Sequence, residues 1–194
     1  MDTDTILSFE HVNAGYGRVQ ILNDLSFEMK RGEVYGVIGP NGCGKTTMFN
    51  ALIGLIIPTK GKIAYDGHDV TKTNAAARCK LGIGRTYQVP RPFEGMSVFE
   101  NVLVASVHGA GHSEKDGRRV ALEALKLTEL YEKREIRAGE LTLLDRKRLE
   151  IARALGTEPK LLLLDEVAAG LTEAEVQDVM KMVANLTAAG YSII

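Results

Sequence analysis

The chain has 194 residues, enough for one sizeable hydrophobic core and a smaller appended subdomain. Its 24 basic and 25 acidic residues leave a formal net charge of −1, which excludes an overall positive field that would recruit nucleic acid or an anionic membrane. Two cysteines are too few for a disulfide framework and favour a reducing compartment. With no signal peptide and no apolar run near the ~20 residues that span a bilayer, we expect a soluble, cytoplasmic protein without a nucleic-acid partner.

The first half of the chain predicts two kinds of strand. Short apolar segments over residues 5 to 30 are typical of antiparallel strands. The continuous apolar run at residues 34 to 38 predicts a central parallel strand that is buried on both faces. A helix is expected from Thr46 to Leu55, and a hairpin over residues 61 to 69 turns near Asp66-Gly67.

The second half is mostly helical in pattern. Residues 97 to 140 begin with a capping-box sequence at Ser97 and contain one polar break at 109 to 117. A second buried strand is expected at 161 to 164, and a short strand begins at Tyr191. Between them lies a helix that starts after Thr172 and ends before Gly190. Its apolar stripe, which we expect to pack in the core, contains Val176, Val179, Met180, Val183 and Leu186.

A glycine-rich loop separates the first apolar run from the helix that follows. Residues 39 to 47, Gly-Pro-Asn-Gly-Cys-Gly-Lys-Thr-Thr, match the phosphate-binding pattern G-x-x-x-x-G-K-[ST]. Its glycines let backbone N–H groups point at an anion in front of a helix N-terminus. In this pattern Lys45 reaches the β- and γ-phosphates, and the Thr46 hydroxyl holds Mg²⁺. The nucleotide-binding residues predicted in the loop are Gly39, Asn41, Gly42, Cys43, Gly44, Lys45, Thr46 and Thr47.

Two adjacent carboxylates end the second buried run, Leu-Leu-Leu-Leu-Asp-Glu at 161 to 166. Ligands bind at the carboxyl edge of open α/β sheets, so Asp165 is placed to ligate Mg²⁺ there. Glu166 is placed to polarise an attacking water as a general base. The alternative interpretation is an acidic pair that caps a helix after the strand. We predict ATP and Mg²⁺ as the ligands of the combined site.

With these motifs in place, the chain resembles the nucleotide-binding subunit of an ABC transporter. Arg-Thr-Tyr-Gln-Val-Pro-Arg-Pro-Phe at 85 to 93 resembles the Q-loop of that family, which implies that Gln88 contacts Mg²⁺ or the attacking water. The segment Ala-Gly-Tyr-Gly-Arg-Val-Gln-Ile-Leu resembles the adenine-stacking loop, with Tyr16 as the aromatic platform. Residues 161 to 175 are similar to the branched-chain amino-acid importer subgroup, with Val167 in place of a proline and Thr172 in place of the usual final asparagine.

The resemblance implies an α/β fold of the P-loop NTPase type. Its parts are an N-terminal antiparallel β subdomain, a RecA-like parallel-sheet core and a helical subdomain. We expect residues 5–88 and 141–194 to form the core with the β subdomain, and residues 89–140 to form the helical subdomain. It further implies a head-to-tail pair of ATPase subunits, identical or different, that energises a membrane permease from the inner face of the cell membrane. The expected solute is a branched-chain amino acid or a related small polar molecule.

One segment departs from the family pattern. Leu-Thr-Leu-Leu-Asp at 141 to 145 stands where the family carries the signature Leu-Ser-Gly-Gly-Gln, which closes over the ATP held by the partner subunit. Thr142 and Asp145 have the spacing of a capping pair, and a carboxylate at a helix start would repel a phosphate. Leu143 and Leu144 add bulk where glycines would let the backbone touch the anion. We expect slow hydrolysis at the composite site built from this segment, unless the variant signature has normal output.

A second departure concerns histidine. The family places a switch histidine just after the strand that begins at Tyr191, whereas the four histidines here lie earlier, at positions 11, 68, 108 and 112. We therefore expect a C-terminally truncated cassette. These two departures keep a catalytically silent cassette with a regulatory or structural role as the alternative function. A soluble ABC protein acting on ribosomes or DNA is less consistent with the sequence, which contains neither a second cassette nor a long coiled-coil insertion.

Overall fold

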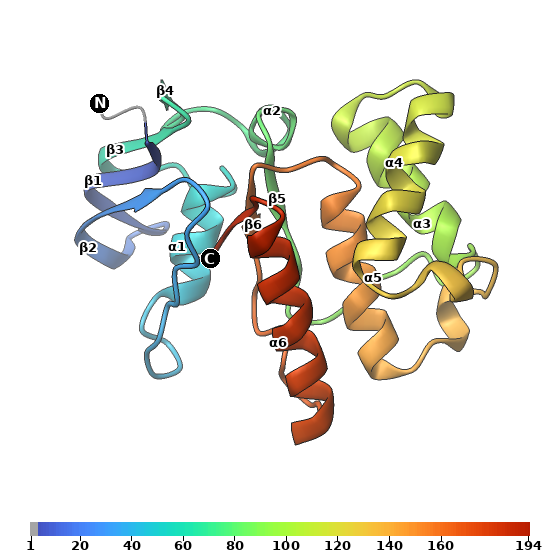
Figure 1. Cartoon of the computed structure of the whole chain (residues 1–194). Coiled ribbons are helices and arrows are strands. Elements are labelled where there is room, and N and C mark those ends of the chain that lie inside the picture. Colours follow the sequence, from blue (N-terminus) through green and yellow to red (C-terminus); the bar gives the residue numbers. More distant parts are fainter. Residues whose placement is uncertain (1–3) are drawn as a thin grey trace.

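The computed structural model describes residues 4–194. Figure 1 shows three parts side by side: an antiparallel sheet, a central layer in which parallel strands lie beside α6 (Glu173–Ala188), and a group of helices that includes α3 (Val98–Val104), α4 (Glu114–Leu127) and α5 (Leu143–Leu155). The antiparallel sheet has the order β2-β1-β3-β4, and its strands are β1 (Thr5–Tyr16), β2 (Val19–Lys30), β3 (Lys60–Tyr65) and β4 (His68–Asp69). The turn between β3 and β4 lies at Asp66-Gly67, as the sequence predicts.

The parallel sheet has the order β5-β6-β7, and its strands are β5 (Ile83–Arg85), β6 (Leu161–Leu163) and β7 (Ser192–Ile193). The strand expected at residues 34 to 38 is reduced to one parallel bridge between Val34 and Ile193 and one hydrogen bond from Tyr35 N–H to Ile193 O at 2.8 Å. Among residues 4–194 only one side of this segment pairs with a strand, so it lies at the sheet edge. Val34 is 53% exposed and Ile38 98%, which corrects the expectation of burial.

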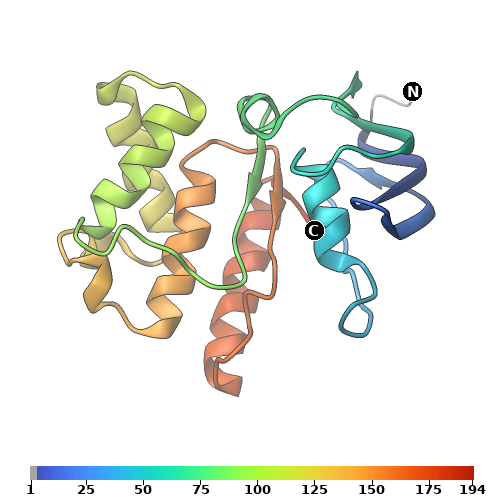
Figure 2. The same ribbon diagram turned by 180° about the vertical axis from the view of Figure 1, so that it is seen from behind.

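Helices pack beside this sheet, and Figure 2 shows the same arrangement from behind. Ser97 and Thr172 both form complete capping boxes with the glutamate three residues later, as predicted. The first helix ends at Leu52, earlier than predicted. The α-helices are α1 (Lys45–Leu52), α2 (Ala75–Lys80), α3 (Val98–Val104), α4 (Glu114–Leu127), α5 (Leu143–Leu155) and α6 (Glu173–Ala188). A π-helix, η1 (Ala105–Ala110), follows α3, and short 3₁₀ turns are η2 (Tyr131–Lys133) and η3 (Ala138–Glu140).

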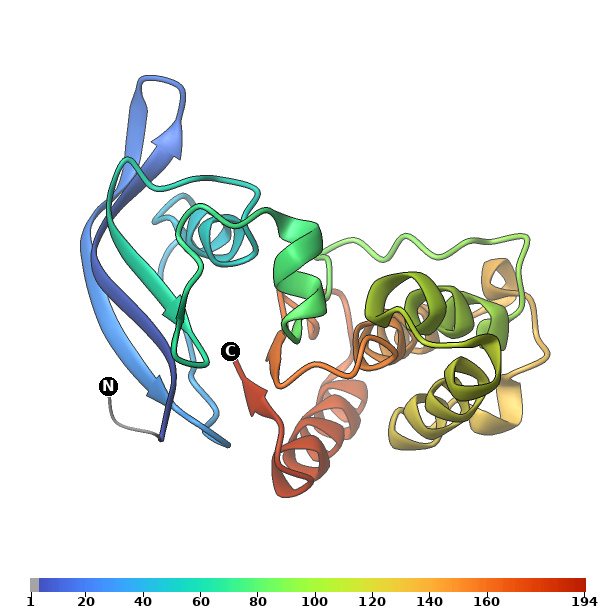
Figure 3. The same ribbon diagram turned by 90° about the horizontal axis from the view of Figure 1, so that it is seen from above.

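Two hydrophobic clusters hold these layers together. In the first, the curved antiparallel sheet packs around α1, as Figure 3 shows from above. The second lies among α3, α4, α5 and α6 and includes Leu162 and Ile193 of the parallel sheet. Because α5 packs against α3 and α4, this core crosses the subdomain border expected at residues 140/141, and the division into subdomains stays a prediction. On α6 the expected stripe is nearly right, but Met180 is exposed and Met182 is buried instead.

A buried arginine fixes the C-terminal end of α1. Arg78 has no exposed surface, and its Nη1 donates to the backbone carbonyls of Ala51 at 2.6 Å and Leu52 at 2.7 Å. The guanidinium therefore satisfies carbonyls that a helix end leaves unpaired, and its positive charge suits the negative end of the helix dipole. No helix among residues 4–194 is both long and apolar enough to cross a bilayer.

Candidate functional site

The N-terminus of α1 is built to receive an anion. Gly42 and Gly44 have φ of 83° and 105°, left-handed values that side chains other than glycine rarely adopt. Gly44 is the N-cap residue, no side chain caps the helix, and its first turn contains no acidic residue. The first N–H groups of a helix have no partner inside the helix, so here they remain available to a ligand.

Lys45 lies folded against the loop from which it projects. Its Nζ donates to the carbonyl oxygens of Gly39 at 2.6 Å and Pro40 at 3.0 Å. A Cβ on Gly39 would lie 2.7 Å from the Sγ of Cys43, so a larger residue at this position would require the Cys43 side chain to move. Cys43 itself is exposed.

A small cavity of about 170 Å³ joins this loop to the acidic residue at the end of β6. It brings together most of the residues that the phosphate-loop motif predicts, and it adds Glu166 from the second motif. Gly39 and Cys43 are outside its lining. The lining residues are Ile21, Asn41, Gly42, Gly44, Lys45, Thr46, Thr47 and Glu166.

The two carboxylates after β6 have different partners. The Oδ2 of Asp165 accepts a hydrogen bond from Nη2 of Arg85 at 2.9 Å, and both side chains are mostly buried. The Oε2 of Glu166 accepts from Nε2 of Gln88 at 2.6 Å, so the structure joins two predicted site residues that are 78 positions apart in sequence. Glu166 has φ of 49°, which is unusual for a residue with a side chain and marks a strained point after the strand.

Tyr16 lies at the end of β1 beside α1, with its ring half exposed. Its hydroxyl oxygen accepts a hydrogen bond from Nδ2 of Asn50 at 2.8 Å, and Oδ1 of Asn50 accepts from Nη1 of Arg85 at 2.6 Å. Sequence reasoning missed both Asn50 and Arg85. A signal for Arg85 was present, because it ends a strand next to β6, whereas nothing in the sequence singles out Asn50.

Lys147 is a third residue that the sequence analysis missed. It is buried on α5, and its Nζ donates to the backbone carbonyl of Glu166 at 3.1 Å. The same carbonyl accepts from the N–H of Ala169 at 3.0 Å, which closes a turn after β6. Burial lowers the pKa of the Lys147 ammonium, and the charge of Glu166 partly opposes that shift.

Three side chains of the predicted metal site carry oxygen ligands: Thr46 lines the cavity beside the phosphate loop, whereas Asp165 and Gln88 lie outside its lining. The Thr46 hydroxyl, the Asp165 carboxylate and the Gln88 amide are the kinds of ligand that Mg²⁺ prefers, so these side chains suit that ion chemically. Among residues 4–194 there is no cluster of three or more histidine, cysteine, aspartate or glutamate side chains that could hold a metal by itself. So few protein ligands suit an ion that is bound partly by the phosphates of a nucleotide. They would not enclose an ion by themselves.

A family model described as ABC transporter matches residues 22–169. The chain belongs to the ABC transporter family. A probable branched-chain amino acid transport ATP-binding protein, LivG of Methanocaldococcus jannaschii, is 33% identical, over 100% of this chain and 80% of the relative. The lipopolysaccharide export ATP-binding protein LptB of Acidithiobacillus ferridurans is also 33% identical, over 97% of this chain and 78% of the relative. A probable ABC transporter ATP-binding protein of Azorhizobium caulinodans is 37% identical, and the chain spans 63% of its length.

Solved ABC structures share the fold. An ATP-binding cassette in its ADP conformation superposes with a TM-score of 0.89 at 30% identity, over 97% of this chain and 79% of that one. A nucleotide-free ATP-binding cassette gives a TM-score of 0.88 at 30% identity, over the same shares of the two chains. The predicted fold class, an ABC ATPase with an antiparallel sheet, a parallel sheet and helices, is therefore confirmed.

The signature segment of this ABC domain differs from expectation in one respect. Asp145 is buried, its carboxylate is paired with Lys133, and Arg148 lies 3.8 Å away, so its charge is largely compensated. The Thr142 hydroxyl accepts from Asp145 N–H at 3.3 Å, which is half of the expected capping pair. Leu143, the first residue of α5, is 46% exposed, and its Cδ2 would lie 3.4 Å from a Cβ on Gly170.

Proposed function

We propose that this ABC domain binds and hydrolyses ATP and energises a membrane importer. The observation that carries the proposal is the single cavity that joins the uncapped start of α1, with Lys45 and Thr46, to Glu166. A phosphate-binding helix end and a carboxylate that can accept a proton face the same space, as phosphoryl transfer to water requires.

In this proposal Lys45 leaves the carbonyls of Gly39 and Pro40 and binds the β- and γ-phosphates. Thr46, Asp165 and Gln88 would hold Mg²⁺, which when bound neutralises developing phosphate charge. The backbone N–H groups of residues 42 to 46 would surround the phosphate oxygens, and Tyr16 would stack on the adenine. The remaining nucleotide contacts are assigned to Asn41, Cys43 and Thr47 of the loop.

Glu166 acts as the general base. Gln88 holds one of its oxygens at 2.6 Å, and Lys147 with Ala169 holds its backbone carbonyl, so the carboxylate has a fixed position at the edge of the cavity. A water in the cavity would give its proton to the free carboxylate oxygen while its own oxygen attacks the γ-phosphorus. The bond from the γ-phosphorus to the β–γ bridging oxygen would break at the same time, and ADP would leave with that electron pair. Positioning of the reacting groups, rather than covalent chemistry by the protein, supplies most of the rate enhancement.

We further propose that the solute is a branched-chain amino acid or a related small polar molecule. The support is the segment 161 to 175 together with the relatives LivG and the high-affinity branched-chain amino acid transport protein BraF of Pseudomonas aeruginosa, which is 34% identical. Relatives named for lipopolysaccharide export and ribose import are of similar identity, so the distinction requires measurement. Transport assays with the cognate permease should give uptake of a branched-chain amino acid, and export of a lipid would refute this assignment.

The expected partners are a second ATPase subunit and a permease, which would hold the domain at the inner face of the cell membrane. Tyr87, Val89 and Phe93 support a protein contact, because these large apolar side chains of the segment at 85 to 93 are exposed. They follow Arg85 directly, so a partner bound there would touch the same segment that positions Gln88.

The test compares ATP binding and ATP hydrolysis of the full chain, alone and with permease and partner subunit. We expect binding of labelled ATP at micromolar to millimolar concentration and its loss in Lys45→Ala. No uptake of ATP, or no effect of that change, would refute the proposal. A second candidate, a cassette that binds ATP but does not turn it over, is favoured by the exposed Leu143 at the signature position. Binding without hydrolysis in the assembled complex would establish it.

A further inference from the structure

A continuous chain of polar contacts runs through the domain from β1 to β6. The Tyr16 hydroxyl bonds to Nδ2 of Asn50, Oδ1 of Asn50 bonds to Nη1 of Arg85, and Nη2 of Arg85 bonds to Oδ2 of Asp165. The four residues come from β1, α1, β5 and the end of β6. Because the amide of Asn50 uses both its nitrogen and its oxygen, it can serve both neighbours in one orientation only.

Arg85 is held from several sides at the centre of this chain. Its side chain is 9% exposed, and that of Asp165 is 13%. The guanidinium carbon lies 5.7 Å from the ring centre of Phe49 and 5.3 Å from that of Tyr87, distances at which an aromatic face attracts a cation. The buried Nε of Arg85 has no hydrogen-bond partner among the described residues. Hydrogen bonds alone therefore do not account for the position of the Arg85 side chain.

This charge arrangement has a consequence for a cation at Asp165. The guanidinium already compensates the carboxylate, and two positive charges that share one carboxylate repel each other strongly in a poorly solvated setting. Only Oδ2 of Asp165 takes part in the ion pair, which leaves the other oxygen for a second positive ligand. The geometry therefore favours competition between Arg85 and a divalent cation for the Asp165 carboxylate, but it does not exclude the cation completely.

We propose that Arg85 is a positioning residue that sets the affinity of the nucleotide site for Mg²⁺ and links that affinity to Tyr16 through Asn50. The inference rests on the proposed function, because it assigns Tyr16 to the adenine and Asp165 to the cation. Arg85 keeps the Asp165 carboxylate compensated and oriented before nucleotide binds. When adenine stacks on Tyr16, the fixed Asn50 amide restrains the guanidinium of Arg85. This restraint changes how strongly the guanidinium binds the Asp165 carboxylate.

The experiment titrates Mg²⁺ into the full chain with a fluorescent ATP analogue and measures the Mg²⁺ midpoint separately from the affinity for the analogue in EDTA. Arg85→Gln removes the competing charge, so we expect the midpoint to fall by about 10-fold while the affinity in EDTA changes less than about threefold. Arg85→Lys retains the charge and should keep the midpoint within about threefold of wild type. Arg119→Gln, at an exposed arginine on α4, is the matched control and should change neither quantity.

A second variant series tests the link and does not depend on the stability of Arg85→Gln. Tyr16→Phe keeps the stacking ring but removes the hydroxyl, and we expect it to lower the Mg²⁺ midpoint about two- to fivefold. In an Asn50→Leu background the same change should have no effect, because the connection is already broken. An unchanged midpoint in both Arg85→Gln and Tyr16→Phe would overturn the inference. If the wild-type chain bound no ATP analogue at all, the proposed function itself would fail, and this inference with it.

Discussion

Lys147 and Glu166 are joined by a hydrogen bond of 3.1 Å between the buried ammonium of the lysine and the backbone carbonyl of the glutamate. Lys147 lies on α5, the helix that begins with the signature segment, and Glu166 is the proposed general base. The helix start that would face a partner's nucleotide is thus tied directly to the base that would act on this chain's own nucleotide.

Lys147→Met should lower the rate of ATP hydrolysis by about 10- to 100-fold, because the left-handed backbone of Glu166 loses a restraint and the base moves out of line. ATP affinity should stay within about twofold of wild type, since no phosphate contact is removed. Steady-state kinetics and nucleotide titration separate these effects. Lys181→Met, at an exposed lysine on α6, is the control. A rate equal to that of the control would exclude a positioning role for Lys147.

Glu166→Gln should reduce hydrolysis by roughly 10²–10⁴-fold and leave ATP binding intact, because the amide preserves shape but cannot accept the proton of water. The measurement is a single-turnover assay beside equilibrium binding. Retention of the wild-type rate in the assembled complex would remove Glu166 from the role of base and point to a phosphate oxygen as the proton acceptor.

Replacing Leu143, Leu144 and Asp145 with Gly, Gly and Gln should raise turnover of the assembled complex, because backbone N–H groups at the start of α5 become accessible. The burial of Asp145 refines this expectation: Leu143→Gly alone should give most of the gain. Asp145→Gln alone should mainly destabilise the fold, since Lys133 loses its partner and Arg148 keeps its ion pair with Glu129 but loses the contact with Asp145. If turnover does not rise in the triple variant, the variant signature is already competent.

Arg78→Met should lower the free energy of unfolding by about 3 kcal/mol, because the carbonyl of Leu52 loses its partner and that of Ala51 keeps only the N–H of Gly54, at 3.3 Å, among the described residues. Urea denaturation followed by circular dichroism measures this loss. Arg18→Met, at an exposed arginine in the β1–β2 turn, should change stability by less than about 0.5 kcal/mol. An equal effect of the two substitutions would contradict the assigned capping role.

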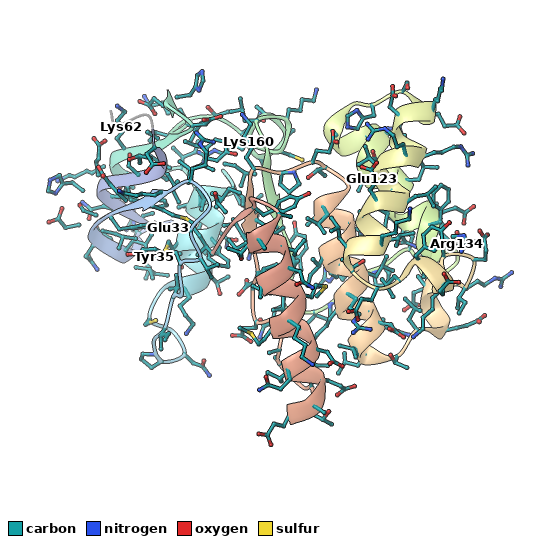
Figure 4. All side chains as sticks on the ribbon, viewed as in Figure 1. Glu33, Tyr35, Lys62, Glu123, Arg134 and Lys160 are labelled. Carbon is teal, nitrogen blue, oxygen red and sulfur yellow. The ribbon has the colours of Figure 1, made fainter. Side chains whose placement is uncertain are left out.

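Asp66 should make stability depend on acid pH. Hydrogen bonds from Lys160, and then from Arg31, lower the pKa of the Asp66 carboxyl; Lys160 is labelled in Figure 4. Because the folded pKa is below the unfolded one, the contribution is present above the unfolded pKa of about 3.9 and is lost as pH falls through the folded value.

Asp66→Asn, which tolerates the left-handed backbone of this turn residue, should therefore cost about 1 kcal/mol at pH 6, an amount kept small by solvent screening. The difference from wild type should shrink as the pH falls below the unfolded pKa and through the folded one. Denaturant unfolding at a series of pH values checks this. A difference that is constant from pH 3 to pH 6 would show that the ion pairs of Asp66 do not contribute.

Local signals gave the most reliable sequence predictions. The capping boxes at Ser97 and Thr172 and the turn at Asp66-Gly67 depend on residues a few positions apart, and all three formed as expected. The phosphate loop is local as well, and its glycines alone determine the positive φ angles at Gly42 and Gly44. The family and its fold followed from these motifs, since their order along the chain matches one architecture.

Features that depend on distant partners were not predictable. The apolar run at 34 to 38 suits a buried strand, but its burial depends on which strands lie on each side of it. The sequence predicts Asp145 as a helix-capping carboxylate that would repel a phosphate, but it does not reveal the compensating partner Lys133, which lies 12 positions upstream in a 3₁₀ turn. The contact between Asn50 and Arg85 spans 35 positions and joins a helix to a strand, so no spacing rule marks it.

The segment between Val34 and Gly39 has a further consequence for dynamics. Among residues 4–194, the strand contacts of this segment lie at its first two residues, and Val37 packs against the first hydrophobic cluster. Ile38 is almost fully in water, so this flank of the phosphate loop is less restrained than the flank that α1 anchors. Amide hydrogen exchange at residues 36 to 39 should therefore be rapid without ligand and slow sharply when the loop closes on a phosphate. Ordering this flank costs conformational entropy each time a nucleotide binds. This cost lowers the affinity of the isolated chain for nucleotide and so favours release.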